Sequence, residues 1–234
     1  MNKYNKENKY EGFSLVEMLI TTFIIGFIML IAALVLTTLI KVSTVTTNKT
    51  KVRNESEYVL ELLRRTIRVT DPTEVKIYNS NRTYNSSSGL VSGEDNLIAV
   101  SEGNKGNEIH IRPYGSSKWI CLAFYKDGEQ KKEGDGSTSM GYILKTSVSE
   151  EVMSRGSNSC FNEEDNRSYN YIVLNSRFVN IRDFKISYRS TEDGNKEIQF
   201  DLEAAATYWY FATGAPLNRN IYRQAIVKTE GIMW

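Results

Sequence analysis

An uncharged apolar run near the start of the chain is the strongest hydrophobic pattern. Residues 18–40 contain no charged side chain. As a helix this run is about 34 Å long, which is enough to cross the hydrocarbon core of a bilayer. The lysines that precede it predict a cytoplasmic N-terminus and an extracytoplasmic C-terminal region.

An amphipathic stretch follows the apolar run. Val45, Val52 and Val59 recur every seven residues, and Lys, Arg and Glu occupy most of the other positions. The pattern predicts that the helix continues to about Val69 and ends at Asp71-Pro72. The stripe is suited to packing on the chain's own head, and it also fits a separate juxtamembrane helix or a coiled-coil dimer.

Beyond Pro72 apolar and polar residues alternate with a period of two, which is typical of strands. Ser190 to Asn195 is rich in turn-forming residues and predicts a hairpin. The expected fold class is α+β, with a long helix packed on a C-terminal head of mostly antiparallel sheet. The expected strands are 74–78, 97–100, 108–112, 118–125, 142–145, 171–174, 178–188, 196–203 and 221–228.

Three long polar segments interrupt the predicted strands, at residues 79–96, 126–139 and 147–170. They are expected to be loops, and they fit either contact surfaces or variable solvated excursions. The acidic groups around Asp127 and at 163–165 lack the ligand spacing of an EF-hand, so no metal site is expected there.

Glu17 is a single carboxylate at the edge of the apolar run. Burying such a charge in a bilayer costs about 2.5–3.5 kcal/mol on insertion scales, so it is expected to have a partner. Gly12 and Phe13 precede it, and the leader before them is short and charged. These residues resemble the class III signal of type IV prepilins and pseudopilins. A plain signal anchor with a snorkelling Glu17 is the alternative.

The resemblance implies a role for each of these residues. Prepilin peptidase would cut between Gly12 and Phe13 and methylate the new amine of Phe13. Glu17 would approach the terminal amine of a neighbouring subunit during assembly. The implied partners are the membrane, prepilin peptidase, other pilin or pseudopilin subunits and a filament assembly platform.

The resemblance also implies a domain organisation. Residues 1–12 would be the cleaved leader, 13–70 the helix and 71–234 a β-rich extracytoplasmic head. Within the helix, residues 13–40 would span the membrane and 41–70 would be amphipathic. Family members often have a proline midway along the membrane helix. This chain has none before Pro72, which leaves Gly26 as its weak point.

The implied function is that of a structural filament subunit, a minor pilin or pseudopilin. The late strands resemble the J-type pseudopilins of type II secretion, and a minor pilin of a type IV pilus or a competence filament has the same pattern. The alternative is a binding module carried on the filament, an adhesin or a DNA-uptake receptor.

Charge and residue types give little support to several other functions, including a surface enzyme with a pilin-type anchor. Without three lysines and two glutamates of the leader, the 29 basic and 28 acidic residues become 26 of each. This balance gives no specific support for nucleic-acid binding. The single histidine, His110, falls in a predicted strand, and Tyr208 to Phe211 are expected to be core. Neither an enzyme nor a cofactor is expected.

Two cysteines, Cys121 and Cys160, would face an oxidising exterior. An even pair in that environment favours a disulfide. Two thiols too far apart to bridge are the alternative, because spacing along the chain does not fix the distance between them.

Overall fold

A computed structural model describes residues 14–93, 97–128, 139–154, 160–161, 171–207 and 220–230. The chain divides into two compact units, residues 1–46 and 47–234. The helices are α1 (Leu15–Arg68) and α2 (Glu150–Ser154). The strands are β1 (Thr70–Asn79), β2 (Thr83–Asn85), β3 (Leu90–Ser92), β4 (Ile98–Ala99), β5 (Glu108–Pro113), β6 (Lys118–Asp127), β7 (Gly141–Ser149), β8 (Ile172–Val173), β9 (Val179–Ser190), β10 (Lys196–Ala206) and β11 (Ile221–Lys228).

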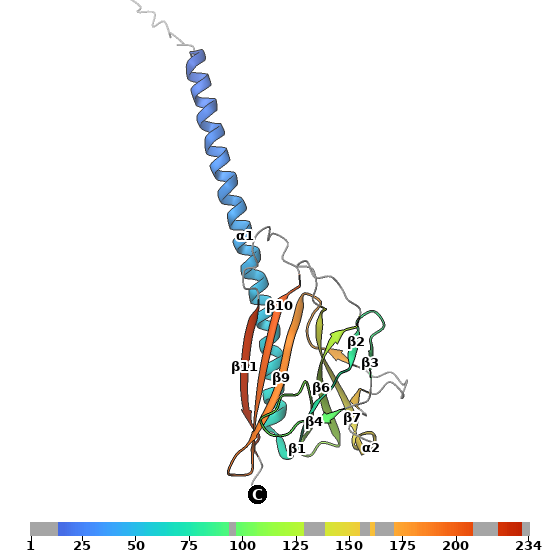
Figure 1. Cartoon of the computed structure of the whole chain (residues 1–234). Helices are drawn as coiled ribbons and strands as arrows, with labels where there is room; N and C mark the ends of the chain where they lie inside the picture. Colours follow the sequence, from blue (N-terminus) through green and yellow to red (C-terminus); the bar gives the residue numbers. More distant parts are fainter. Residues whose placement is uncertain are drawn as a thin grey trace, which may run out of the picture. The chain divides into compact units, whose positions relative to one another are not determined.

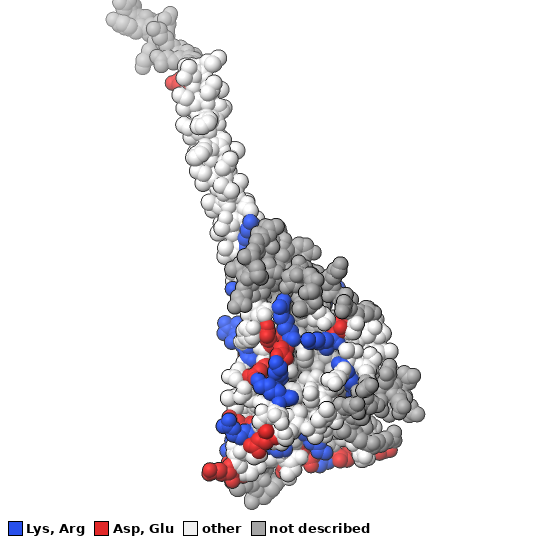
Figure 2. Space-filling model, in the orientation of Figure 1, with Lys and Arg blue, Asp and Glu red and all other residues white. Residues whose placement is uncertain are grey.

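The described part of the first unit is the N-terminal portion of α1. Its apolar side chains are exposed, and α1 is long and apolar enough to cross a membrane. Figure 2 shows this portion almost free of charge, whereas Lys, Arg, Asp and Glu side chains are frequent on the second unit. The exposed apolar surface requires a lipid or protein environment.

The C-terminal portion of α1 packs within the second unit. Val52, Val59, Leu60, Leu63 and Ile67 are all buried in one hydrophobic core with residues from both sheets. The predicted amphipathic stripe is therefore confirmed from Val52 onward. From Val52 to Ile67 the stripe is buried in this core, so these residues are not available for the coiled coil considered above.

Two sheets form the head. The larger is mixed, with strand order β3-β2-β6-β5-β1-β4, and β7 pairs with β6 and β8. The smaller has the order β11-β10-β9. Its strands run side by side along α1 in Figure 1. The α+β, pilin-like architecture predicted from the sequence is confirmed.

A second core cluster lies on the other face of β5, β6 and β7. Alternation along β5 sends Ile109 and Ile111 into the first core, so Glu108 and His110 face the other way. Cys121, Tyr125, Cys160 and Phe161 belong to this second cluster. It holds most of the polar chemistry described below.

The end of α1 differs in detail from the prediction. The helix ends at Arg68, and Asp71 and Pro72 are part of β1. The pairing of β1 with β5 shifts register between Thr70 and Val75, so Pro72 sits where the ladder is interrupted. The Asp71 carboxylate accepts hydrogen bonds from the backbone N–H and the hydroxyl of Thr73 at 2.8 and 2.6 Å, which fixes the turn.

Two of the expected polar loops contain regular structure, and here the prediction was wrong. Residues 79–96 include β2 and β3, and residues 147–170 include the end of β7 and α2. With three residues each, β2 and β3 are too short to show the alternation of apolar and polar residues that is typical of a strand. The sheet is also not purely antiparallel, because β2 pairs parallel to β6. Glu129 and residues 163–165 lie outside the described residues.

The predicted hairpin is confirmed. β9 and β10 pair antiparallel, and the Thr191 N–H donates to the Asn195 carbonyl at 2.9 Å. Gly194, in the turn of this hairpin, has a backbone φ of +78°, which residues with a Cβ atom rarely adopt.

Gly141 marks a close approach of the backbones of β7 and β9. A Cβ there would lie 2.0 Å from the Ile181 carbonyl oxygen and 2.5 Å from Phe124 Cε2. We expect Gly141→Ala to lower the free energy of unfolding by about 2–3 kcal/mol, because the backbone must move apart. Denaturant unfolding of the chain in detergent micelles, followed by tryptophan fluorescence, measures the change.

Gly128→Ala is the matched control, since its Cβ would lie 3.3 Å from the Thr83 hydroxyl oxygen, the end of a side chain. We expect an effect below about 0.5 kcal/mol. Equal losses for the two variants would contradict the close contact at Gly141.

Candidate functional site

Ser14 and Glu17 build the start of α1. Ser14 directly precedes the helix, and its hydroxyl accepts the Val16 N–H at 3.3 Å. The Glu17 carboxylate accepts the Ser14 N–H at 3.0 Å. This is a capping box, in which the first and fourth residues of Ser-x-x-Glu satisfy backbone groups that the helix leaves unpaired. The Ser-x-x-Glu spacing is visible in the sequence, but the prediction considered only the charge of Glu17.

The capping box gives Glu17 a partner within its own chain. The negative carboxylate also lies in the first turn, where the helix dipole favours negative charge. The side chain is nonetheless exposed. It can therefore exchange the Ser14 N–H for a positive group on another molecule. Gly12 and Phe13 lie outside the described residues.

Threonine hydroxyls within the apolar span are satisfied internally. Thr22 Oγ1 donates to the Met18 carbonyl at 2.9 Å, and Thr38 Oγ1 donates to the Leu34 carbonyl at 2.9 Å. Thr21 and Thr37 make the same kind of bond one residue earlier. In hydrocarbon an unpaired polar group is costly, so these bonds suit the span to a membrane.

A buried polar network occupies the second core cluster. His110 Nε2 lies 2.6 Å from Glu108 Oε1, and the Tyr125 hydroxyl donates to Glu108 Oε2 at 2.6 Å. Burial, followed by the charge of Glu108, raises the pKa of Tyr125 well above its ordinary value. Glu108 and His110 have no exposed surface, and the bond from Tyr125 to Glu108 links β6 to β5.

His110 is a strand residue in β5, as predicted. The prediction missed its partnership with Glu108, which lies two residues earlier on the same face of β5. Residues 208–211, the aromatic group predicted to be core, lie outside the described residues.

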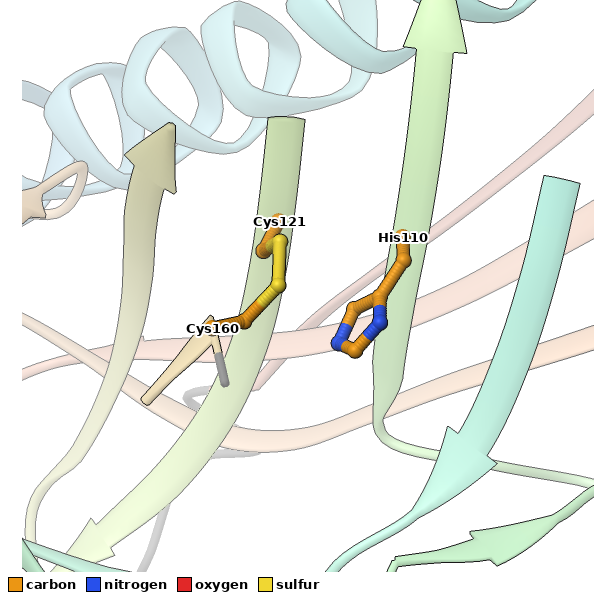
Figure 3. Close-up of side chains that lie close together, drawn as sticks. All are labelled: His110, Cys121 and Cys160. Carbon is orange, nitrogen blue, oxygen red and sulfur yellow. A yellow bond between two sulfur atoms is a disulfide. The ribbon is translucent and has the colours of Figure 1, made fainter. Parts of the chain in front are cut away.

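Cys121 and Cys160 are joined by a disulfide, with their Cα atoms 6.1 Å apart. Figure 3 shows the imidazole of His110, from β5, beside this disulfide. Both cysteines are fully buried. The bond fastens the short segment at residues 160–161 to the central strand β6.

We expect non-reducing peptide mapping to recover Cys121 linked to Cys160. The double variant Cys121→Ala/Cys160→Ala is expected to lose about 3–4 kcal/mol of unfolding free energy, because a loop of about 40 residues is then no longer closed in the unfolded chain. Two free thiols in protein isolated from the extracytoplasmic side would contradict the linkage.

Comparison with known proteins identifies the N-terminal region. Residues 8–33 match the family model described as the prokaryotic N-terminal methylation motif. No curated protein and no solved structure matches the chain. The motif covers Gly12, Phe13 and Glu17 and most of the apolar run at 18–40. This match supports a class III signal of the type IV prepilin and pseudopilin kind at the N-terminus, and the head has the α+β, pilin-like architecture described above.

Proposed function

We propose that the chain is a structural filament subunit, a minor pilin or pseudopilin of a type IV pilus-like or type II secretion filament. The observation that carries the proposal is the methylation motif at residues 8–33, which ends inside a helix fit to span a membrane. The family with this motif is structural, and we propose no enzymatic activity for this chain.

In the proposed pathway the chain is first a membrane protein with a cytoplasmic N-terminus. Residues 1–12 are the leader, residues 13–40 span the membrane and residues 71–234 form an extracytoplasmic head. Prepilin peptidase cuts between Gly12 and Phe13 and methylates the Phe13 amine. An assembly platform then moves the subunit from the membrane into the filament.

Glu17 is proposed to guide this transfer. The exposed carboxylate exchanges the Ser14 N–H for the Phe13 amine of a neighbouring subunit. Opposite charges that meet in low dielectric offset each other's loss of hydration. The pairing sets the register between neighbouring helices, while the exposed apolar side chains of α1 exchange lipid contacts for contacts with other subunits.

The experiment that tests the proposal is quantitative mass spectrometry of sheared, purified filaments from cells that express the chain with its own assembly system. We expect the mature chain in the filament fraction at fewer than about one copy per ten copies of the main subunit. Absence from filaments despite normal membrane levels would overturn the proposal. A majority share would make the chain a major subunit instead.

A filament-borne binding module is tested with the same filaments. Loss of adhesion or of DNA uptake in filaments of normal length and number that lack the chain would favour an adhesin or receptor. Loss of the filaments themselves would favour the structural role.

A further inference from the structure

A group of basic side chains lies on the part of α1 that belongs to the second unit. Between Glu17 and Glu55 the chain has basic residues but no acidic residue. Lys49, Lys51 and Arg53 belong to the second unit, and all three are exposed. This stretch therefore has a local excess of positive charge, although the basic and acidic residues of the whole chain nearly balance. Such an excess attracts anionic partners.

The loop between β8 and β9 adds a fourth cation. Arg177 and Phe178 lie in this loop, and both are exposed. The centroid of the Phe178 ring lies 4.4 Å from Lys51 Nζ and 5.3 Å from Arg177 Cζ, so two cations contact one aromatic ring. We call Lys49, Lys51, Arg53 and Arg177 the basic collar.

Glu55 fixes this loop to α1. Its carboxylate accepts the Ser176 N–H at 2.9 Å and the Ser176 hydroxyl at 2.7 Å. No ion pair joins the basic collar to a carboxylate of a described residue. Four cations beside one carboxylate leave an excess of three positive charges. The charge of the collar is therefore only partly neutralised within the chain.

The basic collar surrounds α1 and does not line a single face. Neighbouring residues of a helix are about 100° apart, so Lys49 and Arg53 lie on one side, and Lys51 lies about 200° around the helix from Lys49. A partner helix that packs on one side of α1 would meet only part of the collar. A membrane surface surrounds a helix that leaves it and therefore meets all of the collar.

The collar is also close enough to a membrane to interact with it. The apolar run at 18–40 ends nine residues before Lys49, and nine helical residues rise about 14 Å. The head groups occupy about 5–8 Å of this distance. Helical side chains tilt toward the N-terminus, so the long basic side chains extend back toward the span. Attraction to an anionic surface acts over about 8–10 Å at physiological salt, and the collar residues of α1 lie within that range.

We propose that the basic collar binds the head groups of anionic phospholipids on the extracytoplasmic surface of the membrane. Each Lys or Arg near such a surface adds to the attraction. The collar thereby holds the head of the unassembled subunit against the membrane until the subunit enters a filament. This inference rests on the topology given under the proposed function.

A second copy of the chain is a less suitable partner for the collar. The carboxylates of Asp183, Asp193 and Asp201 on the small sheet and its hairpin are already paired with lysines of their own chain. This face therefore offers no unpaired group of these three carboxylates to a neighbouring collar. Anionic lipids carry a negative charge that no side chain of the protein neutralises beforehand.

The test uses the full chain reconstituted in phosphatidylcholine vesicles. Trace amounts of spin-labelled phosphatidylglycerol or spin-labelled phosphatidylcholine are added, and electron paramagnetic resonance measures the share of each lipid immobilised at the protein. We expect a preference of about two- to fourfold for phosphatidylglycerol at low salt. The preference should decrease in about 0.5 M NaCl, because salt screens the attraction.

The triple variant Lys49→Gln/Lys51→Gln/Arg53→Gln removes the collar residues of α1. Glutamine has a helix propensity close to that of lysine and arginine, so α1 is kept. We expect the variant to lose at least about half of the preference for phosphatidylglycerol. Arg177→Gln changes only the loop and should lose a smaller part. If the triple variant does not fold, Arg177→Gln alone decides, and an unchanged preference in it would overturn the proposal.

Arg65→Gln/Arg68→Gln/Lys118→Gln is the matched control. It removes the same charge from exposed positions in the last turn of α1 and at the start of β6. The control should keep the wild-type preference. Both triple variants retain the lysines of the leader, so any lipid binding by the leader cancels in the comparison.

No preference for phosphatidylglycerol in the wild type, or equal preference in the two triple variants, would overturn the proposal. A collar variant with normal lipid preference but a lower content in filaments would assign the collar to a neighbouring subunit instead. The vesicles contain neither peptidase nor filament. A negative filament experiment therefore leaves the lipid result standing, and the two proposals fail separately.

Discussion

Gly12→Val is expected to leave the chain uncut in cells that contain a competent prepilin peptidase. The residue before the cleaved bond must fit closely against the peptidase, and a β-branched side chain crowds that position and stiffens the backbone. We expect the processed fraction to fall from nearly all of the protein to almost none. Intact-mass spectrometry measures it directly, because cleavage removes residues 1–12.

Gly26→Val is the matched control for this substitution. Gly26 lies in α1, and a Cβ there meets no atom within 4 Å. The variant should be processed like the wild type. Normal cleavage of Gly12→Val would contradict the assignment of the cleavage site.

Glu17→Gln is expected to lower the amount of the chain in filaments at least about tenfold relative to membranes. Glutamine can still accept the Ser14 N–H, so the capping box that starts α1 is kept. Only the charge is lost, and the Phe13 amine of the neighbouring subunit is left without its partner. Breaking a charge pair in low dielectric costs about 3–5 kcal/mol, which exceeds a tenfold change.

Glu57→Gln makes the same chemical change outside the apolar span, where Glu57 pairs with Arg64 on the surface at 3.1 Å. Exposed ion pairs contribute little, so its filament content should stay at the wild-type level. Equal incorporation of Glu17→Gln, with cleavage verified, would remove Glu17 from assembly and favour the snorkelling anchor. Loss of helix start or of membrane insertion in this variant would instead assign Glu17 to capping alone.

Long periodic patterns were predictable from the sequence. The uncharged run at 18–40 and the stripe through Val52 and Val59 extend over many turns, so the helix was found with an error of one residue at its C-terminal end. Strands as long as β9 and β10 also show their period clearly. In both strands, most of the apolar residues of one face belong to the first core.

The remaining features depend on contacts between distant segments. The short strand β2 depends on the pairing of Tyr84 with Val91 in β3 and on the packing of Tyr84 in the second core cluster. A segment of three residues is too short for its sequence to reveal these contacts. Cys160 meets Cys121 and lies near His110 only when the segment at 160–161 covers β6. The distances between these residues could not be inferred from the sequence. The disulfide therefore stayed one of two alternatives, and the network of Glu108, His110 and Tyr125 was missed.

The mature N-terminus of the wild-type chain tests the central claim most directly. The measurement is intact mass together with peptide sequencing of protein taken from membranes that contain prepilin peptidase. A prepilin-type subunit should lack residues 1–12 and begin at Phe13 with one methyl group on its amine. A chain that stays uncut, or that begins at any other residue, would contradict the account.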